Sequence, residues 1–160
     1  MKYLPFERII YRTNLSEQEI ITRLSGFVEP KKFGFGRTSS KEYEGFINNN
    51  CFEINRMINY RNSFLPQIKG TIQKGNYGTQ IEVTMKLHLF VFVFLLFWCG
   101  FVMFFLISLC LVQQKISVVF LVPVGMLLFV YALTMFGFKT ESKESKEFLK
   151  KSFESEIIDA

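Results

Sequence analysis

The residues with the clearest chemical potential lie in one short segment, Lys31-Lys32-Phe33-Gly34-Phe35-Gly36-Arg37. Two aromatic rings among three cations can press into the interfacial layer of a bilayer while the cations meet anionic headgroups, at about 1 kcal/mol per cation. The simpler alternative is a loop whose rings fold back onto a sheet. Stacking on nucleic-acid bases is disfavoured, because the related RNA-binding signature places Gly directly after the cation and Phe33 intervenes. The functional interpretation of Lys31, Lys32, Phe33, Phe35 and Arg37 is therefore contact with a lipid surface.

Two further candidates for lipid contact, Lys86 and His88, lie where an alternating segment meets a long apolar run. His88 is the single histidine of the chain. Its ring can titrate near neutral pH or meet a lipid phosphate, or it can simply keep its polar edge among headgroups. Arg56 and Arg61 could form a small anion site, but a solvated strand end and a turn are the favoured interpretation of these residues.

Groups able to carry catalysis are scarce. The only aspartate, Asp159, lies next to the end of the chain, and no metalloprotease, nucleophile-elbow or P-loop motif is present. The cysteines Cys51, Cys99 and Cys110 share no metal-ligand spacing, and we expect them to be small buried hydrophobes. The sequence therefore predicts no enzymatic activity, no cofactor and no metal.

The elements that must position these residues begin with two apolar runs, 87–112 and 116–138, separated only by Gln113, Gln114 and Lys115. Each run can cross a hydrocarbon core of roughly 30 Å at about 1.5 Å per helical residue, and neither contains an acidic residue. So short a polar tip joins antiparallel neighbours. The sequence predicts a transmembrane helical hairpin over residues 87–138.

Cations near the ends of the two runs indicate the orientation of the hairpin. Arg61 and Lys86 precede it, five lysines from Lys139 to Lys151 follow it, and the tip carries only Lys115. Because cytoplasmic loops carry the excess of Lys and Arg, both termini are expected in the cytoplasm. Charged residues interrupt the first twenty positions, so no signal peptide is expected. The runs contain no charge and few hydroxyls, which argues against transport through one hairpin.

A small cytoplasmic α+β domain is expected over residues 1–86. The segment Leu15-Ser16-Glu17-Gln18-Glu19-Ile20 has the form of a capping box with a hydrophobic staple, and predicts a helix that stops near Gly26. Apolar alternation and Asn- or Gly-rich turns predict strands at 43–48, 51–58, 67–74 and 79–86, with 6–12 as a fifth. The last strand enters the first apolar run without a linker.

Residues 139–160 are expected to form an amphipathic helix that starts near Thr140 and packs on the sheet. Its apolar residues are Phe148, Leu149, Phe153 and Ile157. The predicted fold is thus an α+β membrane protein, with a small antiparallel sheet, one or two covering helices and a transmembrane helical hairpin.

Four strings within residues 43–100 resemble a group of small bacterial two-helix membrane proteins of unassigned function. They are Tyr43-Glu44-Gly45-Phe46, Phe52-Glu53-Ile54, the segment from Arg61 to Gly70, and the segment from Thr79 to Leu87. The resemblance implies a bacterial inner or plasma membrane, and it implies no activity and no site residue.

Three functions remain open on the sequence. The first is a non-enzymatic membrane-anchored module that acts as a subunit or scaffold of a larger membrane assembly. The second is a homo-oligomeric pore or membrane-disrupting effector, and the third is an anionic-lipid-binding module. The expected partners are membrane lipids and either another protein or further copies of the chain, but not nucleic acid.

Overall fold

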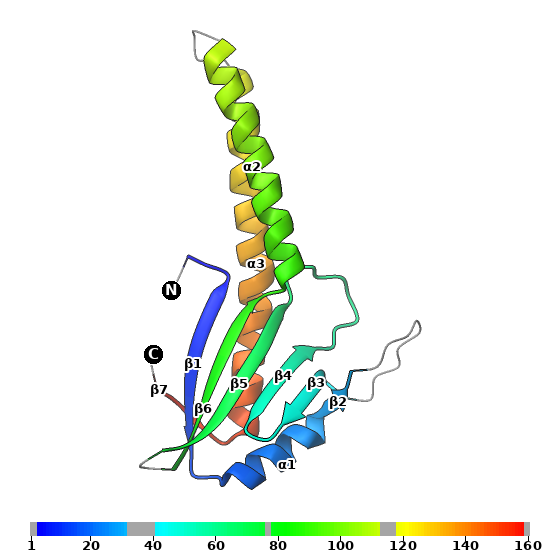
Figure 1. Cartoon of the computed structure of the whole chain (residues 1–160), viewed down its shortest axis with the longest axis vertical. Helices are drawn as coiled ribbons and strands as arrows, with labels where there is room; N and C mark the ends of the chain where they lie inside the picture. Colours follow the sequence, from blue (N-terminus) through cyan, green and yellow to red (C-terminus); the bar gives the residue numbers. More distant parts are fainter. Residues whose placement is uncertain (1–2, 32–40, 76–77, 113–117, 159–160) are drawn as a thin grey trace.

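The computed structural model describes residues 3–31, 41–75, 78–112 and 118–158. Within these residues the chain has an α+β architecture, in which three α-helices accompany one sheet of seven strands. Figure 1 shows two of the helices leaving the sheet together as a long hairpin.

The strands follow the order β2-β3-β4-β5-β6-β1-β7 across the sheet. Neighbouring strands are antiparallel except β2 and β3, which are parallel, so the sheet is mixed and not purely antiparallel as predicted. Strands β2 and β7 were not predicted, because three residues are too short to display an alternating pattern. The bounds are β1 Phe6–Thr13, β2 Val28–Pro30, β3 Tyr43–Asn48, β4 Cys51–Arg56, β5 Pro66–Gly75, β6 Gly78–Leu87 and β7 Glu156–Ile158.

The first helix, α1 (Glu17–Phe27), begins as its sequence requires. The amide of Glu19 donates to the Ser16 hydroxyl at 3.3 Å, and the Glu19 carboxylate accepts from the Ser16 amide at 2.7 Å. These reciprocal bonds satisfy two donors that the first helical turn leaves free, and the predicted capping box is confirmed. The helix continues one residue past Gly26, because Val28 is already extended and starts β2.

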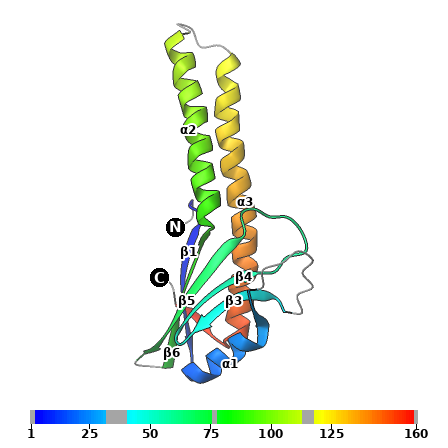
Figure 2. The ribbon, with the colours of Figure 1, turned by 45° about the vertical axis from the view of Figure 1, so that its right-hand side comes forward.

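The hairpin consists of α2 (Leu89–Val112) and the first half of α3 (Leu121–Ser152), which a short 3-10 turn, η1 (Val118–Phe120), precedes. Both helices are long and apolar enough to cross a membrane. At about 1.5 Å per residue, the 24 residues of α2 span about 36 Å. Figure 2 shows the two helices side by side over the length of the hairpin. Most of their large apolar side chains are exposed.

The second half of α3 is the helix that packs on the sheet. The prediction of a separate helix starting near Thr140 is wrong, because α3 runs unbroken from the hairpin to Ser152. A single helical stripe faces the sheet along this half, and Ile157 lies beyond it on β7. The buried residues of the stripe are Phe138, Glu141, Ser142, Ser145 and Leu149.

One face of the sheet forms the core against α3 and α1, and its opposite face is open. Alternate residues such as Ile81, Val83 and Met85 on β6 are fully buried, as their period of two predicts. The end of α3 is tied down by the hydroxyl of Thr13, which donates to the Phe153 carbonyl at 2.8 Å. Arg23 of α1 donates to the Ser152 carbonyl at 2.9 Å.

Two of the three cysteines differ from their prediction as small buried hydrophobes, and Cys99 is half-buried. Cys51 lies exposed on the open face of β4, and Cys110 is exposed on α2. Cys51 pairs with Thr71 across the sheet, so its strand position points it away from the core. The buried positions of β4 are Phe52 and Ile54.

Candidate functional site

The structure describes only part of the predicted lipid-contact set. Lys31 is exposed just after β2, whereas Lys32, Phe33, Phe35 and Arg37 lie outside the described residues. Lys86 and His88 lie together where β6 ends and α2 begins. This junction between sheet and hairpin therefore holds two of the three described members of the predicted set.

Lys86 occupies the open face of the sheet, in the row nearest the hairpin. Strand pairing places it between Phe6 of β1 and Gln67 of β5. The next row holds Arg8, which pairs with Glu82 at 2.7 Å, and Lys69, which pairs with Glu53 at 2.7 Å. Lys86 itself forms no ion pair within the described residues.

A groove of about 570 Å³ opens beside Lys86, and we call it the junction groove. Its polar side consists of Gln67, Lys69 and Lys86 from β5 and β6. Its apolar side joins the segment that leads into β1 to the first turn of the hairpin. The apolar residues that line it are Leu4, Pro5, Phe6, Leu87, Leu89 and Phe92.

His88 accepts hydrogen bonds from the first turn of α2. Its ring nitrogen Nδ1 accepts from the amide of Phe90 at 3.2 Å, and its carbonyl accepts from the amide of Phe92 at 3.0 Å. A free amide in the first turn of the helix is satisfied in this way, which is the role of an N-cap side chain.

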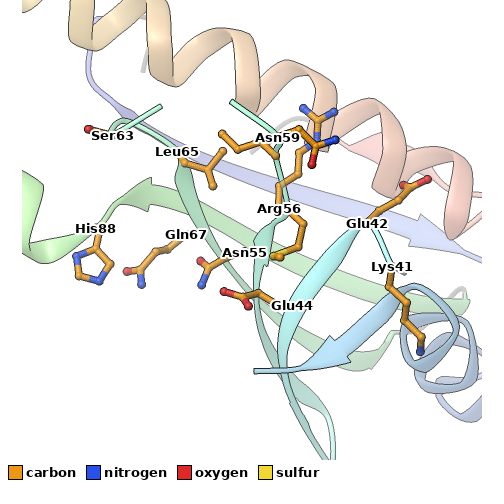
Figure 3. A pocket seen from close by; sticks show the side chains of 12 residues that line it. Lys41, Glu42, Glu44, Asn55, Arg56, Asn59, Ser63, Leu65, Gln67 and His88 are labelled. Carbon is orange, nitrogen blue, oxygen red and sulfur yellow. The ribbon is translucent and has the colours of Figure 1, made fainter. Parts of the chain in front are cut away.

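A second, more polar hollow of about 650 Å³ lies on the other side of Gln67. Figure 3 shows Glu44, Asn55 and Gln67 along neighbouring strands, with His88 at the end of the row. The loop between β4 and β5 contributes Asn59, Ser63 and Leu65 to its rim. Gln67 thus belongs to both cavities, which together follow the edge of the sheet beneath the hairpin.

Behind this hollow, the buried carboxylate of Glu141 on α3 accepts hydrogen bonds from side chains of β4 and of the following loop. Arg56 Nη1 donates to Glu141 Oε2 at 2.9 Å, the Tyr60 hydroxyl donates to Oε1, and Asn62 Nδ2 approaches Oε1 at 3.4 Å. The side chain of Glu141 is 2% exposed. We call these four residues the Glu141 cluster. Arg56 is thus engaged by carboxylates of its own chain, including that of Glu144.

The electrostatics of the cluster agree with this geometry. The hydrogen bond to Glu141 raises the pKa of the Tyr60 hydroxyl above its ordinary value. Burial by itself lowers the pKa of Arg56, but the hydrogen bond and charge of Glu144, with the charge of Glu141, raise it overall. The cluster therefore holds a charged arginine and a neutral tyrosine against α3.

A second contact fixes α3 to the sheet, and it joins β1 to the helix two residues before Glu141. We call it and the Glu141 cluster the two clamps. Lys139 Nζ lies 2.6 Å from Glu7 Oε1. Burial by itself raises the pKa of Glu7, but hydrogen bonds from Lys139 and Ser142 and the charges of Lys139 and Lys146 lower it overall. The ionised form of Glu7 is therefore favoured in the fold.

The lowered pKa of Glu7 makes a pH-dependent contribution to stability. Because the folded pKa lies below the ordinary value of 4.5, the contribution is complete above that value and is lost as the pH falls through the folded pKa. We expect Glu7→Gln to cost about 1 kcal/mol at pH 7, and we expect this cost to decrease as the pH falls below 4.5. Urea denaturation of both proteins in detergent at several pH values measures this, with Glu147→Gln as an exposed control. A cost that stays constant from pH 7 to pH 3 contradicts it.

Sequence reasoning missed most of the junction groove. Lys69 lies on a correctly predicted strand, and Phe6 on a predicted one, but their meeting depends on the pairing of β5 and β1 with β6. The only local signal was the basic and apolar character of the residues around Lys86. Across the described ranges, no cluster of three or more His, Cys, Asp or Glu could hold a metal ion.

Comparison with known proteins adds no relative. No protein-family model, curated protein or solved structure matches this chain.

Proposed function

We propose that this chain is a non-enzymatic module anchored in a membrane, and that it acts as a subunit or scaffold of a larger membrane assembly. In this proposal the hairpin crosses the inner or plasma membrane of a bacterium, and both termini face the cytoplasm. The excess of lysine and arginine at the base of the hairpin over its tip supports this orientation.

The observation that carries the proposal is that the hairpin and the sheet are joined by short, rigid connections. One residue, His88, separates β6 from α2, and α3 continues from the hairpin into the core without a break. A flexible tether would serve a domain that searches for its target. A domain with two rigid attachments is instead held at one height and one angle relative to the hairpin, which suits a fixed place in an assembly.

The two clamps support the same conclusion. Glu7 with Lys139 fixes α3 to β1, and the Glu141 cluster fixes it to the loop after β4. Both lie within the first turn of α3 beyond its apolar half. Among the described residues, no helix covers the open face of the sheet, which carries the ion pairs of Arg8 with Glu82 and of Lys69 with Glu53 and thus offers a polar surface to a partner.

Native mass spectrometry of the full chain, extracted from its own membrane with a mild detergent, tests the proposal. We expect complexes that contain at least one other protein besides the 18.8 kDa chain. A matched variant with a Gly-Ser-Gly insertion between Leu87 and His88 is expected to fold and to lose the partner. A monomer without any partner contradicts the proposal. Homo-oligomers that conduct ions after reconstitution contradict it as well, and favour a pore.

A further inference from the structure

We propose that the junction groove binds one anionic glycerophospholipid from the leaflet next to the sheet. Its phosphate lies at Lys86 and Lys69, and its acyl chains follow Phe92 along α2 into the bilayer. This inference rests on the proposed membrane anchorage, and it adds a specific ligand site that anchorage alone does not require.

The charge of the groove matches a phosphate. Lys86 is exposed and forms no ion pair within the described residues, so its ammonium group is available to an anion. Lys69 lies in the next row of the sheet. Its Nζ is 2.7 Å from Glu53 Oε2, and its side chain is 47% exposed. Gln67 lies between them in the lining and adds amide donors. Two ammonium groups and an amide on rigid strands suit the oxygens of a phosphodiester.

The apolar wall of the groove matches the rest of a lipid. Leu4, Leu89 and Phe92 remain 52%, 71% and 47% exposed, so apolar surface lies in the groove beside two lysines. Leu89 and Phe92 belong to the first turn of α2, so this wall continues directly into the helix that we place in the bilayer. The polarity of the groove therefore changes in the same direction as that of a phospholipid, from headgroup to chain.

The groove is also formed in advance. Its outer wall, the segment before β1, is held against the hairpin by the hydroxyl of Tyr131, which donates to the carbonyl of Tyr3 at 3.1 Å. The pairing of Phe6 with Lys86 fixes the inner end of the same segment. A volume of about 570 Å³ is within the usual range for small-ligand sites. A preformed site loses little conformational entropy when the lipid enters.

Lipid titration followed by native mass spectrometry tests this site on the full-length protein in detergent micelles. The probes are phosphatidylglycerol and phosphatidylcholine with identical chains. We expect a preference for phosphatidylglycerol that Lys86→Gln weakens about fivefold, the usual effect of one cation near a charged surface. Glu53→Gln, which releases Lys69 from its partner, is expected to tighten binding a few-fold. Lys74→Gln, on an exposed lysine at the far end of β5, is expected to leave it unchanged.

Three results overturn the inference. The first is equal retention of the two lipids, and the second is equal binding by the Lys86→Gln and Lys74→Gln variants. The third is displacement of the lipid by glycerol 3-phosphate at a similar concentration, since that ligand has the phosphate without the chains. Co-flotation of the same protein with vesicles separates the proposals. A protein that floats but shows no lipid preference refutes the groove and leaves the anchorage standing, and a protein that does not float refutes both.

Discussion

Replacing Thr140 with proline is expected to lower the free energy of unfolding of the sheet domain by about 3 kcal/mol. Thr140 lies within α3, where its hydroxyl donates to the Phe136 carbonyl at 2.9 Å and its side chain is exposed. Proline lacks the backbone donor, and its ring clashes with the carbonyl one turn earlier. The helix would then break where the hairpin meets the core, and α3 would no longer hold the sheet at a fixed angle.

Hydrogen exchange of the full-length protein in micelles measures this effect. We expect amides of residues 141–152 to lose protection by about two orders of magnitude, while those of α2 change little. Thr140→Ala removes the same hydroxyl but keeps the helix, and its protection is expected to stay near that of the unmodified chain. Equal protection in the proline and alanine variants would show that the continuity of α3 does not stabilise the domain.

Replacing Glu141 with alanine is expected to cost about 3 kcal/mol of unfolding free energy. The change leaves the Tyr60 hydroxyl without its acceptor, leaves Arg56 with Glu144 alone, and opens a small cavity beside the buried face of α3. The matched control is Glu144→Ala, which removes the other carboxylate from the same arginine. The Glu144 side chain is 54% exposed, so its loss is expected to cost less than about 1 kcal/mol.

Urea denaturation of the three proteins under identical micelle conditions compares these costs. The titration of Tyr60 gives an independent readout, because the hydrogen bond to Glu141 raises its pKa. We expect that pKa to fall toward its ordinary value in Glu141→Ala and to change much less in Glu144→Ala. Costs of similar size for the two variants would mean that the buried cluster contributes no more than a surface ion pair.

Thr140→Pro and Glu141→Ala both change the same short stretch of α3, where the hairpin ends and the sheet domain begins. Lys139 contacts Glu7 of β1, and Glu141 contacts Arg56 of β4, so two positions only two residues apart on the helix reach strands on either side of β5 and β6. The ion pair between Glu7 and Lys139 is partly exposed, whereas the Glu141 carboxylate is buried, so we expect the Glu141 cluster to contribute more to the stability of this attachment.

Elements with strong local signals were predictable from the sequence. The capping box at Ser16, the alternation of Ile81, Val83 and Met85, and the two apolar runs each depend on neighbours in the chain. The corresponding elements α1, β6 and α2 occur in the structure at nearly the expected residues, and most of the second apolar run forms the first half of α3. The strands of the two predicted hairpins, β3 with β4 and β5 with β6, also pair as expected.

Features that depend on distant partners were not predictable. The short strands β2 and β7 exist because β3 and β1 offer them an edge. The unbroken α3 was missed because the change from apolar to charged residues at Lys139 resembles a helix boundary, although no residue there stops a helix. Glu141 looks like one of several solvated glutamates, and only the fold reveals that it faces Arg56 and Tyr60.

In the arrangement that we propose, the hairpin crosses a bilayer and α3 leaves it near Lys139. Nitroxide labels placed singly at Phe129, Phe136, Lys143 and Lys150 in vesicles, with the native cysteines replaced, measure the depth of each position. This arrangement predicts that the label at Phe129 is accessible to oxygen and protected from a water-soluble nickel chelate. At Lys143 the label is expected to be more accessible to the chelate than to oxygen. A label at Phe129 as accessible to the chelate as the label at Lys150 would contradict it.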